Sequence, residues 1–149
     1  MNEIIKSAIV PYSSEQMLDL VNGVEFYPEF LQWCSKGFIQ DTFDQGYVAG
    51  MLIRISGVEV QFATRNTIET DGDFTNLMMS LESGPFKKLS GQWQFHQFPA
   101  FGSKVELQLH YEIKSQLLGK MFSKGFDQLA AGLVNDFVNR AGVMYAGKS

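Results

Sequence analysis

The chain has 149 residues, close to the commonest size of one domain, and 45% of them are hydrophobic, which is ordinary for a globular protein. Its formal charge is −4, from 12 Lys and Arg against 16 Asp and Glu, and this balance argues against a general polyanion binder. The single cysteine, Cys34, excludes an intrachain disulfide and favours a reducing compartment. We therefore expect one domain over residues 1–149, located in the cytoplasm.

The charge is distributed unevenly along the chain. Residues 1–30 carry one Lys and five acids, whereas residues 102–149 carry six Lys or Arg and four acids, so a local basic face remains compatible with the acidic total. The N-terminus has an early acid and lacks the apolar region of a signal peptide. No run reaches the roughly 18 apolar residues that a spanning helix needs. Any membrane contact is therefore expected to be peripheral.

The first predicted elements are a strand at Ile4–Val10 and a short helix at Ser14–Asn22. Ser13 and Gln16 fit a capping box, in which the serine side chain caps an amide and the glutamine side chain reaches back. Gly23 suits the C′ position, where a left-handed residue often ends a helix.

The segment Cys34–Ile113 is predicted to form about six strands joined by turns. Before it, Pro28 fits the first turn of a second short helix, Glu29–Trp33, because its missing amide hydrogen is not needed there. Apolar and polar residues alternate in this segment, which gives a strand one buried and one wetter face. The turn signals are Asp44-Gln45-Gly46, Gly57, Asp71-Gly72-Asp73, Gly84-Pro85 and Pro99–Ser103.

A long amphipathic helix is predicted over Gln116–Tyr145, because apolar residues recur there at steps of three and four. These residues are Leu118, Phe122, Phe126, Leu129, Leu133, Phe137, Ala141 and Met144. The four glycines of this helix permit either close approach to a sheet or ligand, or kinks. Successive strands with segregated helices indicate an α+β fold with an antiparallel sheet. Since this helix is the only long element able to cover the sheet, the sheet is expected to curve around it.

The sequence contains no convincing set of catalytic residues. His96 and His110 occupy outward positions of two strands, and no Cys/His/Asp cluster has the spacing of metal ligands. Asp71 and Asp73 are explained by a hairpin turn, and Cys34 by a structural role. We predict no catalytic residue, no metal and no required cofactor. Lys87-Lys88 is a basic pair that is either a solvated edge or a contact to RNA or a membrane surface.

Apolar side chains from separate segments are the more informative set. If the sheet grips the helix, many of them converge, and ligand sites are typically apolar clefts with few polar groups. Spacing alone leaves open whether that space is a cavity or a filled core. The candidate ligand-binding residues are Phe30, Trp33, Phe62, Leu77, Met79, Trp93, Phe95, Phe126, Leu129, Leu133 and Phe137.

Five segments in order carry a resemblance that spans essentially the whole chain. They are Val10–Met17, Val24–Cys34, Phe62–Asn66, Gly84–Phe95 and Phe137–Ala141. Together they resemble the coenzyme Q-binding and ribosome-association toxin RatA family, within the START-like, polyketide cyclase/dehydrase-like superfamily. The sequence departs from the usual family pattern at Gly23, Gln32 and Asp136, which bears on the identity of the ligand more than on the fold.

The resemblance implies a helix-grip fold and two functions. It implies binding of ubiquinone or a related isoprenoid lipid in a cavity between sheet and C-terminal helix, in support of respiration, with contact peripheral to the inner membrane. The alternative is a toxin that binds the large ribosomal subunit and blocks subunit association. An enzyme of the cyclase or dehydratase type is the third hypothesis, weakened by the missing acid–base set, and no DNA partner is expected.

Overall fold

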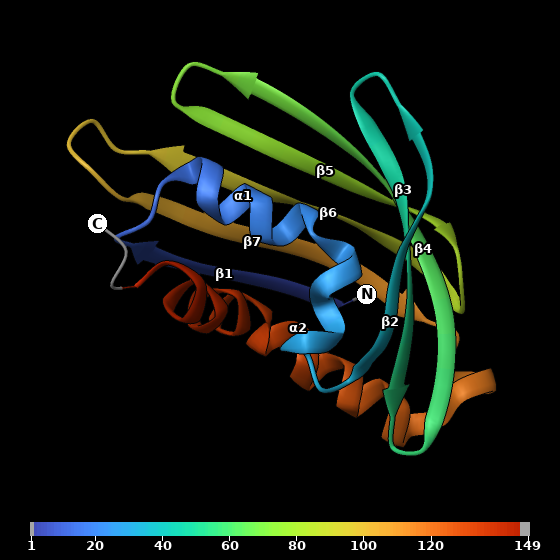
Figure 1. Cartoon of the computed structure of the whole chain (residues 1–149). Helices are drawn as coiled ribbons and strands as arrows, with labels where there is room; N and C mark the ends of the chain where they lie inside the picture. Colours follow the sequence, from blue (N-terminus) through green and yellow to red (C-terminus); the bar gives the residue numbers. More distant parts are fainter. Residues whose placement is uncertain (1, 147–149) are drawn as a thin grey trace.

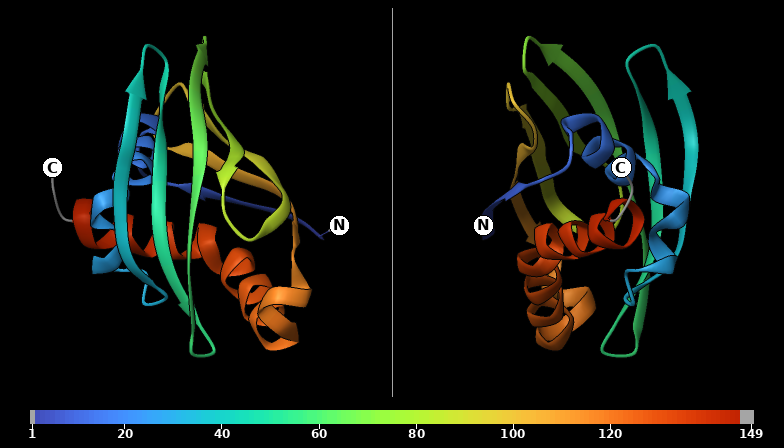
Figure 2. Two further views of the ribbon diagram at one scale, coloured as in Figure 1. Left: turned by 90° about the vertical axis from the view of Figure 1, so that its right-hand side faces the viewer. Right: turned by 60° about the vertical axis from the view of Figure 1, so that its left-hand side comes forward.

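The computed structural model describes residues 2–146, except for the side chains of residues 115–117. Seven strands form one antiparallel sheet in the order β1-β7-β6-β5-β4-β3-β2. The sheet curves, and the long C-terminal helix lies across its concave face (Figures 1 and 2). The predicted α+β helix-grip fold is confirmed. The elements are β1 (Asn2–Val10), α1 (Ser14–Asn22), η1 (Val24–Glu29), β2 (Cys34–Phe43), β3 (Gly46–Ile55), β4 (Val58–Asp71), β5 (Phe74–Ser83), β6 (Phe86–Gln97), β7 (Ser103–Ile113) and α2 (Ser115–Tyr145).

Helix α1 begins and ends where its sequence predicts, and the capping box is confirmed. The Gln16 amide donates to Ser13 Oγ at 3.1 Å, and the Ser13 amide donates to Gln16 Oε1 at 2.9 Å. Gly23 does end the helix, but with a φ of −78°. The expectation of a left-handed cap at this position is therefore wrong, because the chain turns directly into η1.

The second short helix was predicted at Glu29–Trp33, and this position is wrong. The structure has a 3₁₀ helix at Val24–Glu29 instead, with Pro28 inside it. A 3₁₀ helix has three residues per turn, which places the buried side chains of Val24 and Tyr27 on one face. Phe30 ends the helix with a φ of −140°.

The six strands predicted between Cys34 and Ile113 are confirmed. They form a meander, and each is hydrogen-bonded to the next one in the chain. The β3–β4 hairpin turns through Ser56 and Gly57, whose φ values of 52° and 79° suit a two-residue turn with both residues left-handed. Strand β1 completes the sheet by pairing with β7, from Asn2 opposite Tyr111 to Val10 opposite Ser103.

Helix α2 kinks at Gly119, whose φ is 84°. At Gly125 a side chain would collide with Ile55, so this glycine permits close approach of the helix to the sheet. Farther along, the Asp127 carboxylate accepts hydrogen bonds from the buried Tyr111 hydroxyl and, at 2.9 Å, from the Asn2 amide group. These contacts fix α2 to β7 and β1. Among the described residues no helix is long and apolar enough to cross a membrane.

Two hydrophobic clusters fill most of the space between sheet and helices. The α1 cluster joins Met17 and Val21 of α1 to buried side chains of β5, β6 and the last turns of α2, including Leu77, Phe95 and Ala141. The hairpin cluster lies at the other end of the concave face. It joins the β3–β4 hairpin to the first half of α2 through Ile53, Ile55, Phe62, Tyr111, Phe122 and Phe126.

Candidate functional site

A cavity of about 90 Å³ lies where the two clusters meet, between the concave face of the sheet and α2. We call it the seam cavity. Its walls are almost entirely apolar. They belong to both clusters: Trp93 and Phe137 come from the α1 cluster, whereas Phe62 and Phe126 come from the hairpin cluster. The sheet grips the helix here without filling the space between them.

Eight of the eleven candidate residues line this cavity. They are Trp33, Phe62, Met79, Trp93, Phe126, Leu129, Leu133 and Phe137. Strands β4, β5 and β6 contribute three of them because alternating side chains of a strand point to one face. The α2 residues follow the helical repeat, with Leu129 and Leu133 on the partly exposed side of the buried stripe.

The other three candidates, Phe30, Leu77 and Phe95, lie outside the lining. Leu77 and Phe95 are fully buried in the α1 cluster, where α1 packs over that part of the sheet. Phe30 packs on Phe137, with ring centroids 5.3 Å apart, and beneath the Arg140 guanidinium. It therefore helps to attach the end of η1 to α2 and does not contribute to the cavity wall.

Sequence reasoning missed seven lining residues: Tyr27, Met51, Thr64, Leu89, Leu107, Leu109 and Ala130. The alternation of β6 and β7 carried the signal for the three leucines. Thr64 follows Phe62 at the two-residue period of β4, and Ala130 follows Phe126 by one helical turn, but both are small enough to be overlooked. Tyr27 was missed because η1 was placed too late in the chain.

Few polar groups lie around the cavity, and most of them already form hydrogen bonds within the protein. The Tyr27 hydroxyl donates to the Val21 carbonyl, and burial raises the pKa of this hydroxyl well above its usual value. Nearby, the Tyr47 hydroxyl donates to Asn22 Oδ1 at 2.6 Å. Thr64 adds one hydroxyl to the wall. These neutral groups suit hydrogen bonding to a ligand better than proton transfer near neutral pH.

The histidines lie on the convex face of the sheet, away from the cavity. His96 stacks on Phe74 with ring centroids 4.2 Å apart, and His110 Nδ1 lies 3.2 Å from a Glu3 carboxylate oxygen. Cys34 is buried, and burial raises the pKa of its thiol. In the part of the chain that the structure describes, no group of three or more His, Cys, Asp or Glu side chains is arranged to hold a metal ion.

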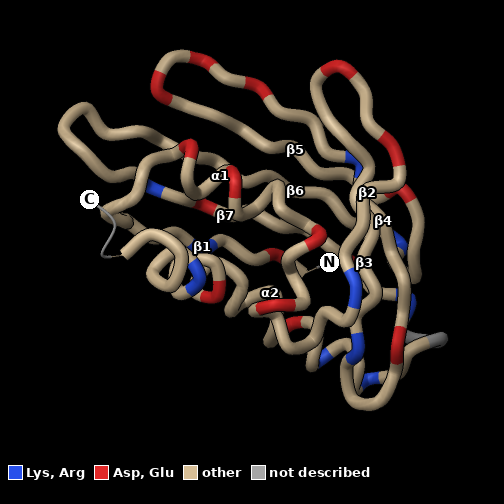
Figure 3. The backbone as a smooth tube through the Cα atoms, in the orientation of Figure 1, with Lys and Arg blue, Asp and Glu red and all other residues tan. Residues whose placement is uncertain are grey.

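Charged residues are distributed unevenly along the length of the strands (Figure 3). The tips of the β2–β3 and β4–β5 hairpins carry acids, among them Asp44, Asp71 and Asp73. The opposite end, which we call the basic end, holds the β3–β4 and β5–β6 turns and the start of α2. Its cationic side chains are Lys36, Arg54, Lys87, Lys88, Lys114, Lys120 and Lys124.

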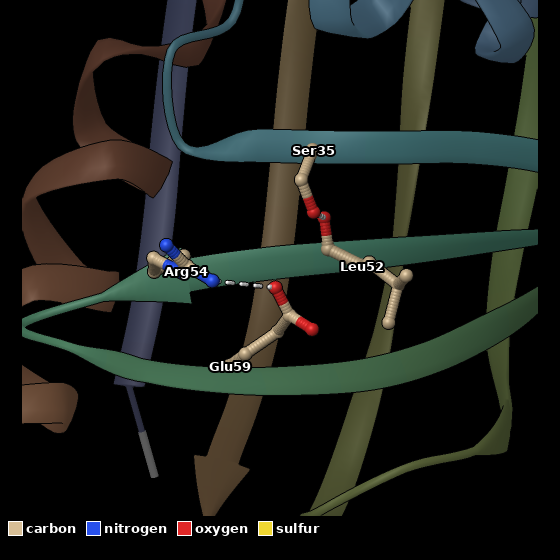
Figure 4. Close-up of polar contacts among 4 residues, drawn as sticks. All are labelled: Ser35, Leu52, Arg54 and Glu59. Atoms are coloured by element: carbon tan, nitrogen blue, oxygen red, sulfur yellow. Dashed lines mark hydrogen bonds and ion pairs between the residues drawn. The ribbon is translucent and has the colours of Figure 1, made fainter.

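Acids at the basic end compensate only part of its charge. Arg54 pairs with Glu59 across the β3–β4 hairpin at 3.3 Å, beside the bond from Ser35 Oγ to the Leu52 carbonyl (Figure 4). Lys87 Nζ lies 3.6 Å from a Glu112 carboxylate oxygen. The other five cations of the basic end form no ion pair within the described residues. The small total charge therefore conceals a locally cationic surface that includes Lys88.

Comparison with known proteins identifies the family. Residues 10–138 match the model of a family described as polyketide cyclase / dehydrase and lipid transport. The chain belongs to this family. A ribosome association toxin RatA of Vibrio cholerae is 38% identical over 97% of this chain and 99% of its own length. A persistence and stress-resistance toxin PasT of Escherichia coli is 35% identical over 99% and 92%, respectively. The resemblance drawn from the five sequence segments is thereby confirmed.

Solved structures of low sequence identity share the fold. A protein from Thermus thermophilus has a TM-score of 0.78 at 17% identity, covering 97% of this chain and all of the other. An aromatase/cyclase from a Streptomyces species has a TM-score of 0.76 at 13% identity, covering 99% of both chains. Enzymes therefore occur among the structural neighbours of the family, whereas the sequence relatives given above are named as toxins.

Proposed function

We propose that this chain binds an isoprenoid lipid of the ubiquinone type in the seam cavity, in support of respiration. The observation that carries the proposal is an almost wholly apolar cavity enclosed by sheet and helix, with a few neutral polar groups beside it. Apolar walls favour a hydrocarbon tail, and each buried CH₂ contributes about 0.8 kcal/mol. Aromatic walls such as Trp93 and Phe126 suit a flat ring.

Binding requires the cavity to widen. Its present volume of about 90 Å³ is smaller than the roughly 150 Å³ of an apolar cavity that accepts benzene. Met51 and Met79 form part of the wall, and unbranched methionine side chains adapt readily to a new neighbour. Leu129 and Leu133 lie on the partly exposed side of α2. We propose that these four side chains move to admit the ligand, and that a tail leaves past the two leucines.

We propose binding and not catalysis because the described groups beside the cavity do not form an acid–base pair. Tyr27 is the titratable residue in its wall, and its raised pKa and engaged hydroxyl remove it as a general base. The histidines lie on the other face of the sheet. A cyclase-type activity would be supported instead if a polyketide-like substrate turned over on the purified protein.

Fluorescence titration tests the proposal. Both tryptophans of the chain, Trp33 and Trp93, line the cavity, so a bound quinone should quench emission saturably. Affinity should increase from a quinone without a tail to analogues with one and two isoprene units. Leu129→Phe should weaken binding by filling the space, whereas Val143→Phe on the exposed side of α2 should leave it unchanged. Absence of saturable binding by every analogue and by extracted lipids would exclude the proposal.

A second candidate function is association with the large ribosomal subunit through the basic end. Its support is the cationic surface described above, together with sequence relatives named ribosome association toxins. Cosedimentation with isolated subunits should weaken as salt rises, because counterions are released on binding to RNA. Lys88→Glu with Lys120→Glu should reduce it, whereas Lys6→Glu on β1 should not. Cosedimentation that resists both salt and these charge reversals would exclude this surface.

A further inference from the structure

We infer that Asn66, together with Thr64, recognises a hydroxyl group on the ligand, so that the site favours a phenol, a reduced quinol or a prenol over a quinone. This inference rests on the proposed lipid binding and specifies its chemistry. Both residues belong to Phe62–Asn66, one of the five segments that carry the family resemblance. An apolar cavity alone gives the polar side chains of this segment no role.

The Asn66 side chain is a buried polar group that lacks a full set of partners. The residue is 5% exposed, and its Oδ1 atom has no hydrogen-bond partner among the described residues. A buried acceptor left in this state is destabilising, since it loses its hydrogen bonds to water and gains none in return. Such a residue in an otherwise apolar region indicates a role that the folded chain alone does not fulfil.

Asn66 is outside the lining of the seam cavity but adjoins two residues that belong to it, Thr64 and Met79. It follows Thr64 on the same face of β4, about 7 Å farther along the strand. Its partner in register on β5 is Met79, which lines the cavity. Rotation of the Met79 side chain therefore enlarges the cavity toward Asn66, in the same movement that admits a ligand ring.

Neighbouring groups favour the amide oxygen of Asn66 as the atom offered to the ligand. Tyr47 is its partner in register on β3, and the Tyr47 hydroxyl already donates its proton to Asn22 Oδ1 at 2.6 Å. Burial raises the pKa of Tyr47, and a hydrogen bond from the Asn66 side chain partly opposes this rise. Since the Tyr47 hydroxyl has given its proton to Asn22, its oxygen is free to accept one from the Asn66 amide nitrogen, whereas Asn66 Oδ1 is an acceptor that requires a donor.

A hydroxyl group complements this arrangement on both sides. It donates its proton to Asn66 Oδ1 and accepts one from the Thr64 hydroxyl, whereas the carbonyl oxygen of a quinone only accepts. An ether of the same shape likewise leaves Oδ1 unpaired, and sites built around a buried polar group discriminate against ligands that fail to pair it.

Three ligands of nearly equal size distinguish recognition of a hydroxyl group from lipid binding alone. We would titrate the protein with 4-heptylphenol, 4-heptylanisole and heptylbenzene, using quenching of the two tryptophans. The phenol should bind at least about fivefold more tightly than the anisole, corresponding to one net hydrogen bond. Equal binding of phenol and anisole, with heptylbenzene also bound, would overturn the inference and leave lipid binding intact. Binding of none of the three would reject lipid binding and the inference with it.

Matched variants locate the preference. In Asn66→Leu the ratio of phenol to anisole affinity should fall to about one while heptylbenzene affinity is retained, and Thr64→Val should reduce the ratio partially. Asn76→Leu is the control, because Asn76 Oδ1 also lacks a partner but the residue lies on the convex face. If Asn66 served only to hold Tyr47, Asn66→Leu would lower Tm and keep the ratio. An unchanged or raised Tm with the ratio lost is the result expected for recognition.

Discussion

Ala130 and Ala141 lie three turns apart on one face of α2, and both are fully buried, yet only Ala130 borders empty space. Opposite Ala141, side chains of α1 such as Met17 and Val21 occupy the gap between sheet and helix. Opposite Ala130 no residue of α1 contributes to the wall, and the seam cavity remains. Burial from solvent and complete packing are thus separate properties, and the short helix α1 accounts for the difference.

The largest effect should follow truncation within the α1 cluster. Phe95→Ala removes a fully buried ring from a filled region and should cost about 3–5 kcal/mol of unfolding free energy. Leu129→Ala at the cavity should cost much less, because that side chain is partly exposed and already borders empty space. Urea unfolding of both variants measures the difference. A cost for Leu129→Ala as large as that for Phe95→Ala would mean that the cavity is closed in solution.

Replacement of Ala130 and Ala141 by valine should give a smaller difference in stability, but one between chemically identical substitutions. Ala141→Val should cost about 1–3 kcal/mol, because it overpacks the α1 cluster. Ala130→Val should be tolerated to within about 1 kcal/mol, since its added methyl groups enter the cavity. Each variant controls for the other, because both carry the same penalty for valine in a helix. Thermal unfolding compares them, and equal losses of Tm would contradict the packing difference.

The reactivity of a cysteine thiol should distinguish the packed α1 cluster from the seam cavity without a large change in stability. Cys34 belongs to the α1 cluster, and its burial raises the pKa of the thiol, so less of the reactive thiolate is present at neutral pH. We expect slow reaction with a disulfide reagent such as DTNB in the folded protein. In a Cys34→Ala background, Met79→Cys should react faster. A Cys34 thiol that reacts as fast as in the unfolded chain would show that the α1 cluster opens readily.

Much of the fold was predictable because it depends on local periodicity. One buried face imposes alternation on the strands from Cys34 to Ile113, and the residues Ser13 and Gln16 alone specify the start of α1. The position of η1 was missed, because a 3₁₀ helix of six residues leaves too short a pattern to distinguish from an α-helical one. Pro28 is compatible with either position.

The candidate site was predictable only in part. Periodicity places Trp93 and Phe95 on the same face of β6, but it does not reveal that α1 covers one and leaves the other beside a cavity. That distinction depends on packing between segments distant in sequence. Thr64 and Asn66 were overlooked in the sequence. A polar residue among the inward-facing residues of a strand requires a partner, so these two residues could have indicated polar groups near the cavity.

The pairing of β1 with β7 has a consequence for how the chain reaches its native state. Strands β2 to β7 each bind a neighbour that is adjacent in sequence, so this part of the sheet can form progressively from the ribosome. Strand β1 has to wait for a partner roughly 100 residues downstream, a long-range contact of the kind that slows folding. Until β7 emerges, the side chains of Ile4 and Val10, which pack into the two clusters of the folded protein, and the open hydrogen-bonding edges of β1 are available to other chains. Strand β1 therefore waits longest for its partner in the sheet, and we expect it to benefit from a chaperone during that time.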